Sequence, residues 1–177
     1  MIVTGLDLSL TATGITVIDG SDITTSRART DSCDDDVRMV RKRIRTAHHL
    51  IMQRLPESGL FVIEGPSYNS KFGKPHERAG LWWMVVDSVL TRGEVAVVPP
   101  QSRAMYATGS GAANKAAVRA AMRAAFPGVQ IPDDNVADSL ALALMGSRHL
   151  GHLLDGALPK KHLEAMSKVL WPTTKGI

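Results

Sequence analysis

The segment IVTGLDLSLTATGITVIDGSDITTSRART, residues 2–30, decides the fold class because it contains three strand patterns separated by short turns. Residues 2–9 alternate and are rich in β-forming side chains, and residues 13–19 repeat that character. The turn signal DGSD at residues 19–22 is followed by a third strand pattern at residues 23–30. Strands this close in sequence pair through tight turns, so we expect an antiparallel meander.

Helical and strand patterns alternate after the meander. The acidic residues 34–36 favour the start of a helix over residues 37–55, where apolar side chains recur at helical spacing. The remaining patterns predict strands at 60–64 and 94–98 and helices at 75–92, 113–126, 134–147 and 161–170. Pro99 and Pro100 are expected to end the last strand. This order predicts an α/β, ribonuclease-H-like fold, a mixed five-stranded sheet with helices on both faces.

Length and composition are typical of one globular domain. The chain has 177 residues, of which 44% are hydrophobic and 21% are charged. We expect a domain at residues 1–150 and a tail at 151–177 that contains a short helix. No membrane partner is expected, because no apolar run is long enough for a membrane span and Asp7 interrupts any signal-peptide pattern. A single cysteine, Cys33, is typical of a protein from a reducing cytoplasm.

Positive charge is segregated along the chain, which has a net charge of +4. Residues 37–54 contain six Lys or Arg and no acid, whereas seven of the 17 acids lie in residues 1–36. Such segregation favours a polyanion partner, because phosphate neutralisation releases counterions. A solvated helix face explains the same pattern equally well, so charge alone does not decide the function.

Three acidic residues lie in segments whose neighbours belong in a hydrophobic core. Asp7 lies inside the first strand, Glu64 ends the strand FVIE, and Asp138 lies in the small, apolar helix 134–147. Because buried unpaired charge is costly, we expect these acids to converge around cations. Asp134 precedes Asp138 by four residues and therefore shares its helix face.

Carboxylate ligands without His or Cys select Mg²⁺, for which Mn²⁺ can substitute, over zinc. Two such ions about 3.5–4 Å apart can activate a water and stabilise the leaving oxygen of a phosphodiester. Three of these acids also have a structural explanation. Asp7 can be a strand-end turn residue, Glu64 a strand terminus paired with an arginine, and Asp134 a helix cap. The acids taken together favour metal-dependent hydrolysis.

Four motifs in order resemble those of the RuvC Holliday-junction resolvases, and in particular their bacteriophage-encoded branch. The motifs are GLDLSLTATG at residues 5–14, FVIE at 61–64, GSGAANKAAV at 109–118 and DNVADSLALA at 134–143. The resemblance covers roughly residues 1–150. It implies a bacterial, cytoplasmic homodimer that binds a four-way DNA junction. Such a dimer nicks opposing strands with Mg²⁺, leaving 5′-phosphate and 3′-hydroxyl ends.

The resemblance also assigns the metal-binding acids by position. Asp7, Glu64 and Asp138 match three of them. Where many bacterial members carry a fourth acid or a histidine, three residues before the last Asp, this chain has Asn135. Asp134 lies one residue earlier, so Asp134 and Asn135 are alternative fourth ligands.

Basic and aromatic residues near these motifs are candidate DNA contacts. Lys115, which follows the GSG turn, is expected to face a phosphate near the metals as part of the catalytic site. Arg119 and Arg123 continue its stripe on one helix face and are either DNA contacts or solvated side chains. The loop after Glu64 adds two lysines and two aromatic residues, one of which either wedges against junction bases or anchors its own loop. These residues are Tyr68, Phe72, Lys71 and Lys74.

The helix that contains LWWMVV, residues 81–86, is apolar on nearly every face, so both of its sides must be covered. The sheet covers one side, and a second subunit is expected to cover the other. The predicted dimer interface consists of Leu81, Trp82, Val85, Val86 and Val89.

Three other functions share parts of this pattern. A ribonuclease-H-like nuclease acting on flaps, forks or RNA–DNA hybrids would use the same acids. A non-catalytic DNA-binding protein would gain nothing from acids that face phosphates. An actin-like nucleotide-binding protein normally needs two such domains and therefore more chain. Branched-DNA cleavage is the function that the sequence favours.

Overall fold

The computed structural model describes residues 1–66 and 74–173, and within them five strands form one mixed sheet in the order β3-β2-β1-β4-β5. The strands are β1 Val3–Asp7, β2 Ala12–Asp19, β3 Asp22–Arg29, β4 Gly59–Glu64 and β5 Gly93–Val98. β1, β2 and β3 pair antiparallel in sequence order, whereas β4 runs parallel to β1 and β5 runs parallel to β4. The predicted meander with parallel additions is confirmed.

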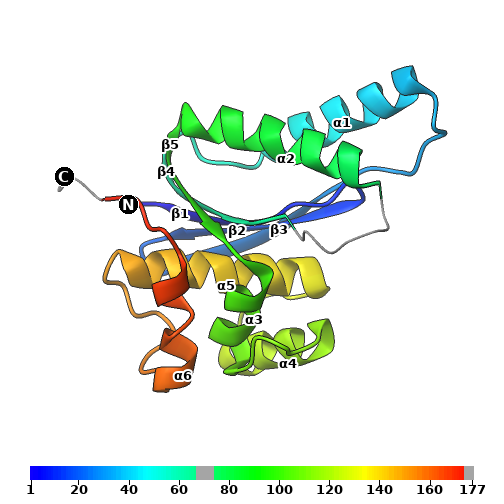
Figure 1. Ribbon diagram of the computed structural model, residues 1–177. Helices are drawn as coiled ribbons and strands as arrows, with labels where there is room; N and C mark the ends of the chain where they lie inside the picture. The colour runs from blue at the N-terminus through cyan, green and yellow to red at the C-terminus, as the bar shows by residue number, and fades with distance from the viewer. Residues whose placement is uncertain (67–73, 174–177) are drawn as a thin grey trace.

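Helices cover both faces of this sheet (Figure 1). α1 and α2 pack on one face, and α5 packs on the other with α3, α4 and α6 on its outer side. The helices are α1 Val37–Met52, α2 Pro75–Leu90, α3 Pro100–Thr108, α4 Lys115–Ala125, α5 Asp134–His149 and α6 Lys160–Leu163. The predicted α/β class is therefore confirmed. Within the residues described, no helix has both the length and the hydropathy for a bilayer crossing.

α3 is the helix that the sequence pattern does not predict. Pro99 and Pro100 do end β5, but Pro99 is also the N-cap of α3 and Pro100 its first residue. Proline is well tolerated at the start of a helix, because the first N–H groups have no intrahelical acceptor. α3 brings the buried side chains of Arg103 and Tyr106 into the domain. The missing helix therefore matters for the site.

The chain beyond α5 returns to α3 and closes the core there. Ala165 and Val169 are buried, and Nδ1 of His162 lies 2.8 Å from the backbone oxygen of Tyr106. The Tyr106 hydroxyl donates to Asp155, which also pairs with Arg148. The tail is therefore a structural part of the fold along its described length.

The burial of residues on α2 differs from the predicted dimer interface. Four of the five predicted interface residues are buried in the core between α2 and the sheet, so they are not available to a partner. These are Leu81, Val85, Val86 and Val89. Periodicity alone could not show that the chain itself covers them. The exposed apolar residues of α2 include Trp83, 65% exposed, and Leu90, 58% exposed, which lie on one side of the helix because they are seven positions apart.

α5 lies against β1 and β2 at a distance that requires glycine. A Cβ atom on Gly5 would lie 2.0 Å from the backbone oxygen of Ser139, and one on Gly14 would lie 2.0 Å from that of Asn135. The buried hydroxyls of Thr16 and Ser139 are 2.8 Å apart and form a hydrogen bond across the same contact. This packing places the first turns of α5 beside the carboxyl end of β1.

Gly5→Ala is expected to lower the free energy of unfolding by about 2–3 kcal/mol, because the added methyl meets backbone atoms that cannot move independently. Gly128→Ala is the matched control, since nothing lies within 4 Å of its Cβ position. The control is expected to be neutral or slightly stabilising. Urea unfolding of both variants measures the difference, and equal stability of the two would contradict the close packing.

Candidate active site

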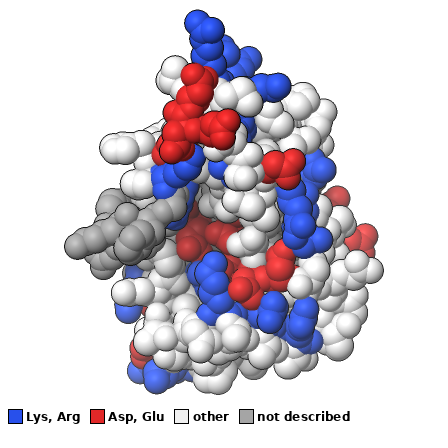
Figure 2. Space-filling view, turned by 90° about the vertical axis from the view of Figure 1, so that its right-hand side faces the viewer, with Lys and Arg blue, Asp and Glu red and all other residues white. Residues whose placement is uncertain are grey.

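Asp7 and Glu64 end neighbouring parallel strands. Asp7 is the last residue of β1 and Glu64 the last residue of β4, and the preceding residues Leu6 and Ile63 pair directly. Strands that run parallel end at the same edge of a sheet, so both carboxylates emerge together. Asp138 lies one turn into α5. It is close enough to Asp7 for its negative charge to raise the pKa of Asp7. Figure 2 shows a hollow in which acidic side chains gather, with Lys and Arg around it.

The site holds these acids at an electrostatic cost. Burial raises the pKa of Asp7 well above its ordinary value, and the charges of Glu64 and Asp138 raise it further. Burial also raises the pKa of Asp138, to about 6, although the nearby Arg103 opposes that shift. Each shift shows that the ionised carboxylate is disfavoured where it lies. A group of this kind gains free energy from any cation that reaches it.

Arg103 contacts two of these acids directly. Its Nε donates to Oε2 of Glu64 at 2.8 Å, and its Nη1 lies 2.7 Å from Oδ1 of Asp138. The Arg103 side chain is only 8% exposed. An arginine partner is one of the explanations that the sequence offers for Glu64, but no local pattern identifies Arg103 as that partner. The signal was present in Pro100, which marks the start of the helix that carries it.

The donor atoms suit a hard divalent cation. Oδ1 of Asp138 is buried and accepts no hydrogen bond, because its contact with Arg103 lacks hydrogen-bond geometry. Carboxylate oxygens are the ligands that Mg²⁺ and Mn²⁺ prefer. However, no three His, Cys, Asp or Glu side chains among the described residues are grouped closely enough to hold a metal ion. The described acids are electrostatic neighbours with an arginine between two of them.

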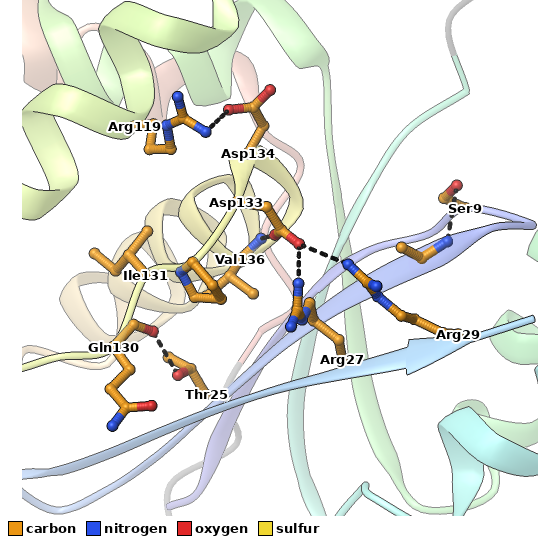
Figure 3. A network of polar contacts seen from close by, with 12 residues as sticks. Ser9, Thr25, Arg27, Arg29, Arg119, Gln130, Ile131, Asp133, Asp134 and Val136 are labelled. Carbon is orange, nitrogen blue, oxygen red and sulfur yellow. Dashed lines mark hydrogen bonds and ion pairs between the residues drawn. The ribbon is translucent and has the colours of Figure 1, made fainter.

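A separate network holds the N-terminus of α5 (Figure 3). Asp133, rather than Asp134, is the N-cap, and its side chain accepts from the backbone N–H of Val136 at 3.1 Å. Oδ2 of Asp133 also accepts from Nη1 of Arg27 at 2.7 Å and lies 3.8 Å from Nη2 of Arg29. β3 is thereby tied to α5, and the alternative of Asp134 as the helix cap is wrong by one residue.

Asp134 is the first residue of α5 and lies near Asp138. Its Oδ1 is 3.3 Å from Nη1 of Arg119 on α4, is buried and accepts no hydrogen bond. Its charge raises the pKa of Asp138. Asn135, the alternative fourth ligand, has its backbone oxygen against Gly14. Of the two alternatives, Asp134 is thus the one whose carboxylate lies near Asp138 and has a buried oxygen that accepts no hydrogen bond.

The basic residues of α4 divide between the site and the scaffold. Lys115 begins α4 after its cap Asn114, and its charge lowers the pKa of both Asp7 and Asp138. Arg123 instead donates to the backbone oxygen of Ile131, from Nε at 2.9 Å and Nη2 at 2.5 Å. Arg123 thereby ties α4 to the segment before α5, and its role as a DNA contact stays a prediction.

Most of the predicted DNA-binding loop after Glu64 lies outside the described residues. Tyr68, Lys71 and Phe72 fall within residues 67–73, so their roles stay predictions. Lys74 is described and pairs with Asp35. This ion pair includes a carboxylate that is 87% exposed, and pairs of this kind contribute little to stability.

A pocket of about 90 Å³ opens beside Asp7 and Glu64. Trp82 lines it and donates from its indole Nε1 to the backbone oxygen of Glu64 at 2.9 Å. The predicted place of Trp82 in a dimer interface stays a prediction, because its side chain is only partly buried. Its indole fixes the end of β4, where Glu64 leaves the sheet.

The fold and this acidic edge define an α/β domain of the ribonuclease-H-like class. Within that class, the structure is similar to RuvC of Thermus thermophilus, with a TM-score of 0.61 and 18% identity, covering 85% of this chain and 97% of that one. It is equally similar to T. thermophilus RuvC in complex with Holliday junction substrate, with a TM-score of 0.60, 18% identity and coverage of 85% and 96%. No protein-family model and no curated protein matches the sequence. The chain therefore has the RuvC fold.

Asp7→Asn is expected to stabilise the protein in EDTA at pH 7.5 by about 1 kcal/mol, or roughly 2–4 °C in Tm. The raised pKa means that ionised Asp7 costs the folded state free energy above the pKa of the unfolded chain. As the pH falls below the unfolded pKa of about 3.9, the carboxyl becomes protonated in both states, so the gain is expected to shrink near pH 4 and to vanish toward about pH 3. Thermal unfolding across this pH range measures it.

The matched control for this experiment is Asp87→Asn, which removes an exposed acid from α2. It is expected to change Tm little at any pH. A gain for Asp7→Asn that is absent at pH 7.5, or that grows as the pH falls, would contradict the electrostatic cost assigned to Asp7.

Proposed function

We propose that this chain is a metal-dependent endonuclease that cuts branched DNA, with the four-way junction as its main substrate. The observation that carries the proposal is the convergence of Asp7, Glu64 and Asp138, from three separate elements, at one edge of a RuvC-like sheet. One of the similar structures is RuvC in complex with a Holliday junction substrate, which supports the same substrate class here.

In this proposal Asp7, Glu64 and Asp138 would hold Mg²⁺ or Mn²⁺, with Asp134 as the fourth ligand. Two ions, when bound, would lower the pKa of a water and neutralise charge on the phosphodiester. Lys115 offers a cationic donor to a nearby phosphate oxygen. Breaking the P–O3′ bond leaves a 5′-phosphate and a 3′-hydroxyl end.

The competing functions differ in substrate or in chemistry. Flaps, forks and RNA–DNA hybrids could be cut by the same acids, because the reacting bond is the same. A protein that only binds DNA is disfavoured, because a cluster of buried acids weakens contact with phosphates. The cost that burial imposes on Asp7 and Asp138 is explained by catalysis and has no purpose in binding alone.

We expect wild-type protein with Mg²⁺ or Mn²⁺ to nick synthetic four-way junctions and to be inactive in EDTA. Asp7→Asn is expected to bind the junction with similar affinity and to cut it at least about 10³-fold more slowly. Gel-shift and single-turnover cleavage assays measure the two properties. Normal cutting by Asp7→Asn in Mg²⁺ would end the proposal.

The same assay identifies the substrate when junction, flap, fork and RNA–DNA hybrid are compared at equal concentration. Faster cutting of the junction supports the resolvase. Faster cutting of another substrate would assign the chain to the alternative nuclease, and binding without cutting would assign it to the non-catalytic class.

A homodimer is proposed as well, because nicking two opposing strands requires two active sites. The exposed side chains of Trp83 and Leu90 give α2 an apolar outer surface for a second copy. Trp83→Ser is expected to shift a dimer to monomer in sedimentation at micromolar concentration. Leu153→Ser, which removes an apolar residue 57% exposed in the tail, is the control. A monomeric wild-type protein would contradict the proposed dimer.

A further inference from the structure

Arg103 binds two of the proposed metal ligands directly. Its Nε–Oε2 contact with Glu64 is 2.8 Å, and its Nη1–Oδ1 contact with Asp138 is 2.7 Å. The exposed fractions of these side chains are 8% for Arg103, 16% for Glu64 and 2% for Asp138. The guanidinium thus joins the end of β4 to the second turn of α5 in a site that is nearly closed to water.

A divalent ion and Arg103 need the same oxygen atoms. A metal held by Glu64 and Asp138 takes lone pairs from their carboxylate oxygens, and the guanidinium lies against one oxygen of each. Two cations cannot share these oxygens closely without repelling one another. In the residues that the structure describes, the acids are not grouped tightly enough for a metal ion.

The scaffold fixes the backbone of Arg103. α3 is held by the tail through the contact of His162 with the backbone oxygen of Tyr106 and through the bond of Tyr106 to Asp155. The guanidinium would therefore leave the acids by a change of side-chain conformation, with the helix held in place.

We propose that Arg103 is the built-in counter-cation of the metal-free site and that it competes with divalent cations for Glu64 and Asp138. This inference rests on the proposed function, because it takes these acids as metal ligands. Arg103 stabilises the folded protein when no metal is present, and it lowers the affinity of the site for metal. Arg103 is thus a positioning residue that determines when the site accepts metal.

The test uses full-length Arg103→Gln without DNA and has two readouts, Tm in EDTA and Mn²⁺ binding by calorimetry and thermal shift. Loss of the guanidinium leaves two buried carboxylates without a partner, so Tm in EDTA is expected to fall by roughly 6–20 °C. Mn²⁺ is expected to bind on the order of tenfold more tightly than to wild type. Mn²⁺ is also expected to recover most of the lost stability.

Two controls separate direct competition from other effects. Lys115→Gln removes a positive charge that acts on Asp7 and Asp138. It therefore tests whether the loss of any nearby positive charge raises the affinity for Mn²⁺. Arg92→Gln removes another partly buried arginine, which bonds backbone oxygens at the far end of α2, so it tests destabilisation alone. Neither is expected to tighten Mn²⁺ binding more than about twofold.

Arg103→Lys keeps the charge but cannot bridge both acids with a planar fork, so it is expected to lie between wild type and Arg103→Gln in both readouts. It also provides the measurement if Arg103→Gln does not fold. An equal gain in Mn²⁺ affinity for Lys115→Gln, or weaker Mn²⁺ binding in both Arg103 variants, would overturn the competition. If neither wild type nor any variant binds Mn²⁺, the proposed metal-dependent function itself fails, which is a different result.

Discussion

The close packing of α5 on β1 and β2 is the constraint on which the rest of the structure depends. Because Gly5 and Gly14 lack a Cβ atom, the backbone of α5 lies directly on the sheet, and the Thr16–Ser139 hydrogen bond fixes its position. Asp138 can reach the ends of β1 and β4 only from a helix this close. The acidic edge therefore depends on backbone geometry. Glycines in the first two strands allow α5 to approach the sheet closely enough for its acid to reach the strand ends.

This geometry creates an electrostatic problem that the fold must solve. Three carboxylates lie together where burial raises the pKa of Asp7 and Asp138, so the ionised site disfavours the folded state. A buried ion pair seldom adds much net stability, but buried carboxylates without a counter-charge are costly. Arg103 offsets that cost at Glu64 and Asp138 through direct ion pairs, and it acts on Asp7 through its charge. A site that carries such a cost is characteristic of function rather than of stability.

The sequence predicts those parts of the fold and the site that depend on local patterns. Alternation in residues 2–30 predicts the meander, and acids within apolar segments indicate Asp7, Glu64 and Asp138. It does not predict Arg103. Pro99-Pro100 marks both the end of β5 and the start of α3, and a proline pair after a strand pattern indicates the strand end more readily than a new helix. Nor does the sequence show which side of α2 packs against the rest of the chain. Periodicity identifies an apolar helix face but not the element that packs on it. Contacts among residues 64, 103 and 138 are set by tertiary packing, which no local pattern contains.

The tail completes this chain of dependence. Arg103 can meet Glu64 and Asp138 only if α3 is held in place, and α3 is short, at 9 residues, with no side-chain cap. A helix of this length is marginal alone, so tertiary contacts must hold it. Those contacts come from Asp155 and Arg148 at the Tyr106 hydroxyl and from His162 at the Tyr106 carbonyl. Asp155 and His162, which follow α5, therefore act on the site indirectly, because they help to fix the helix from which the counter-charge of the acids extends.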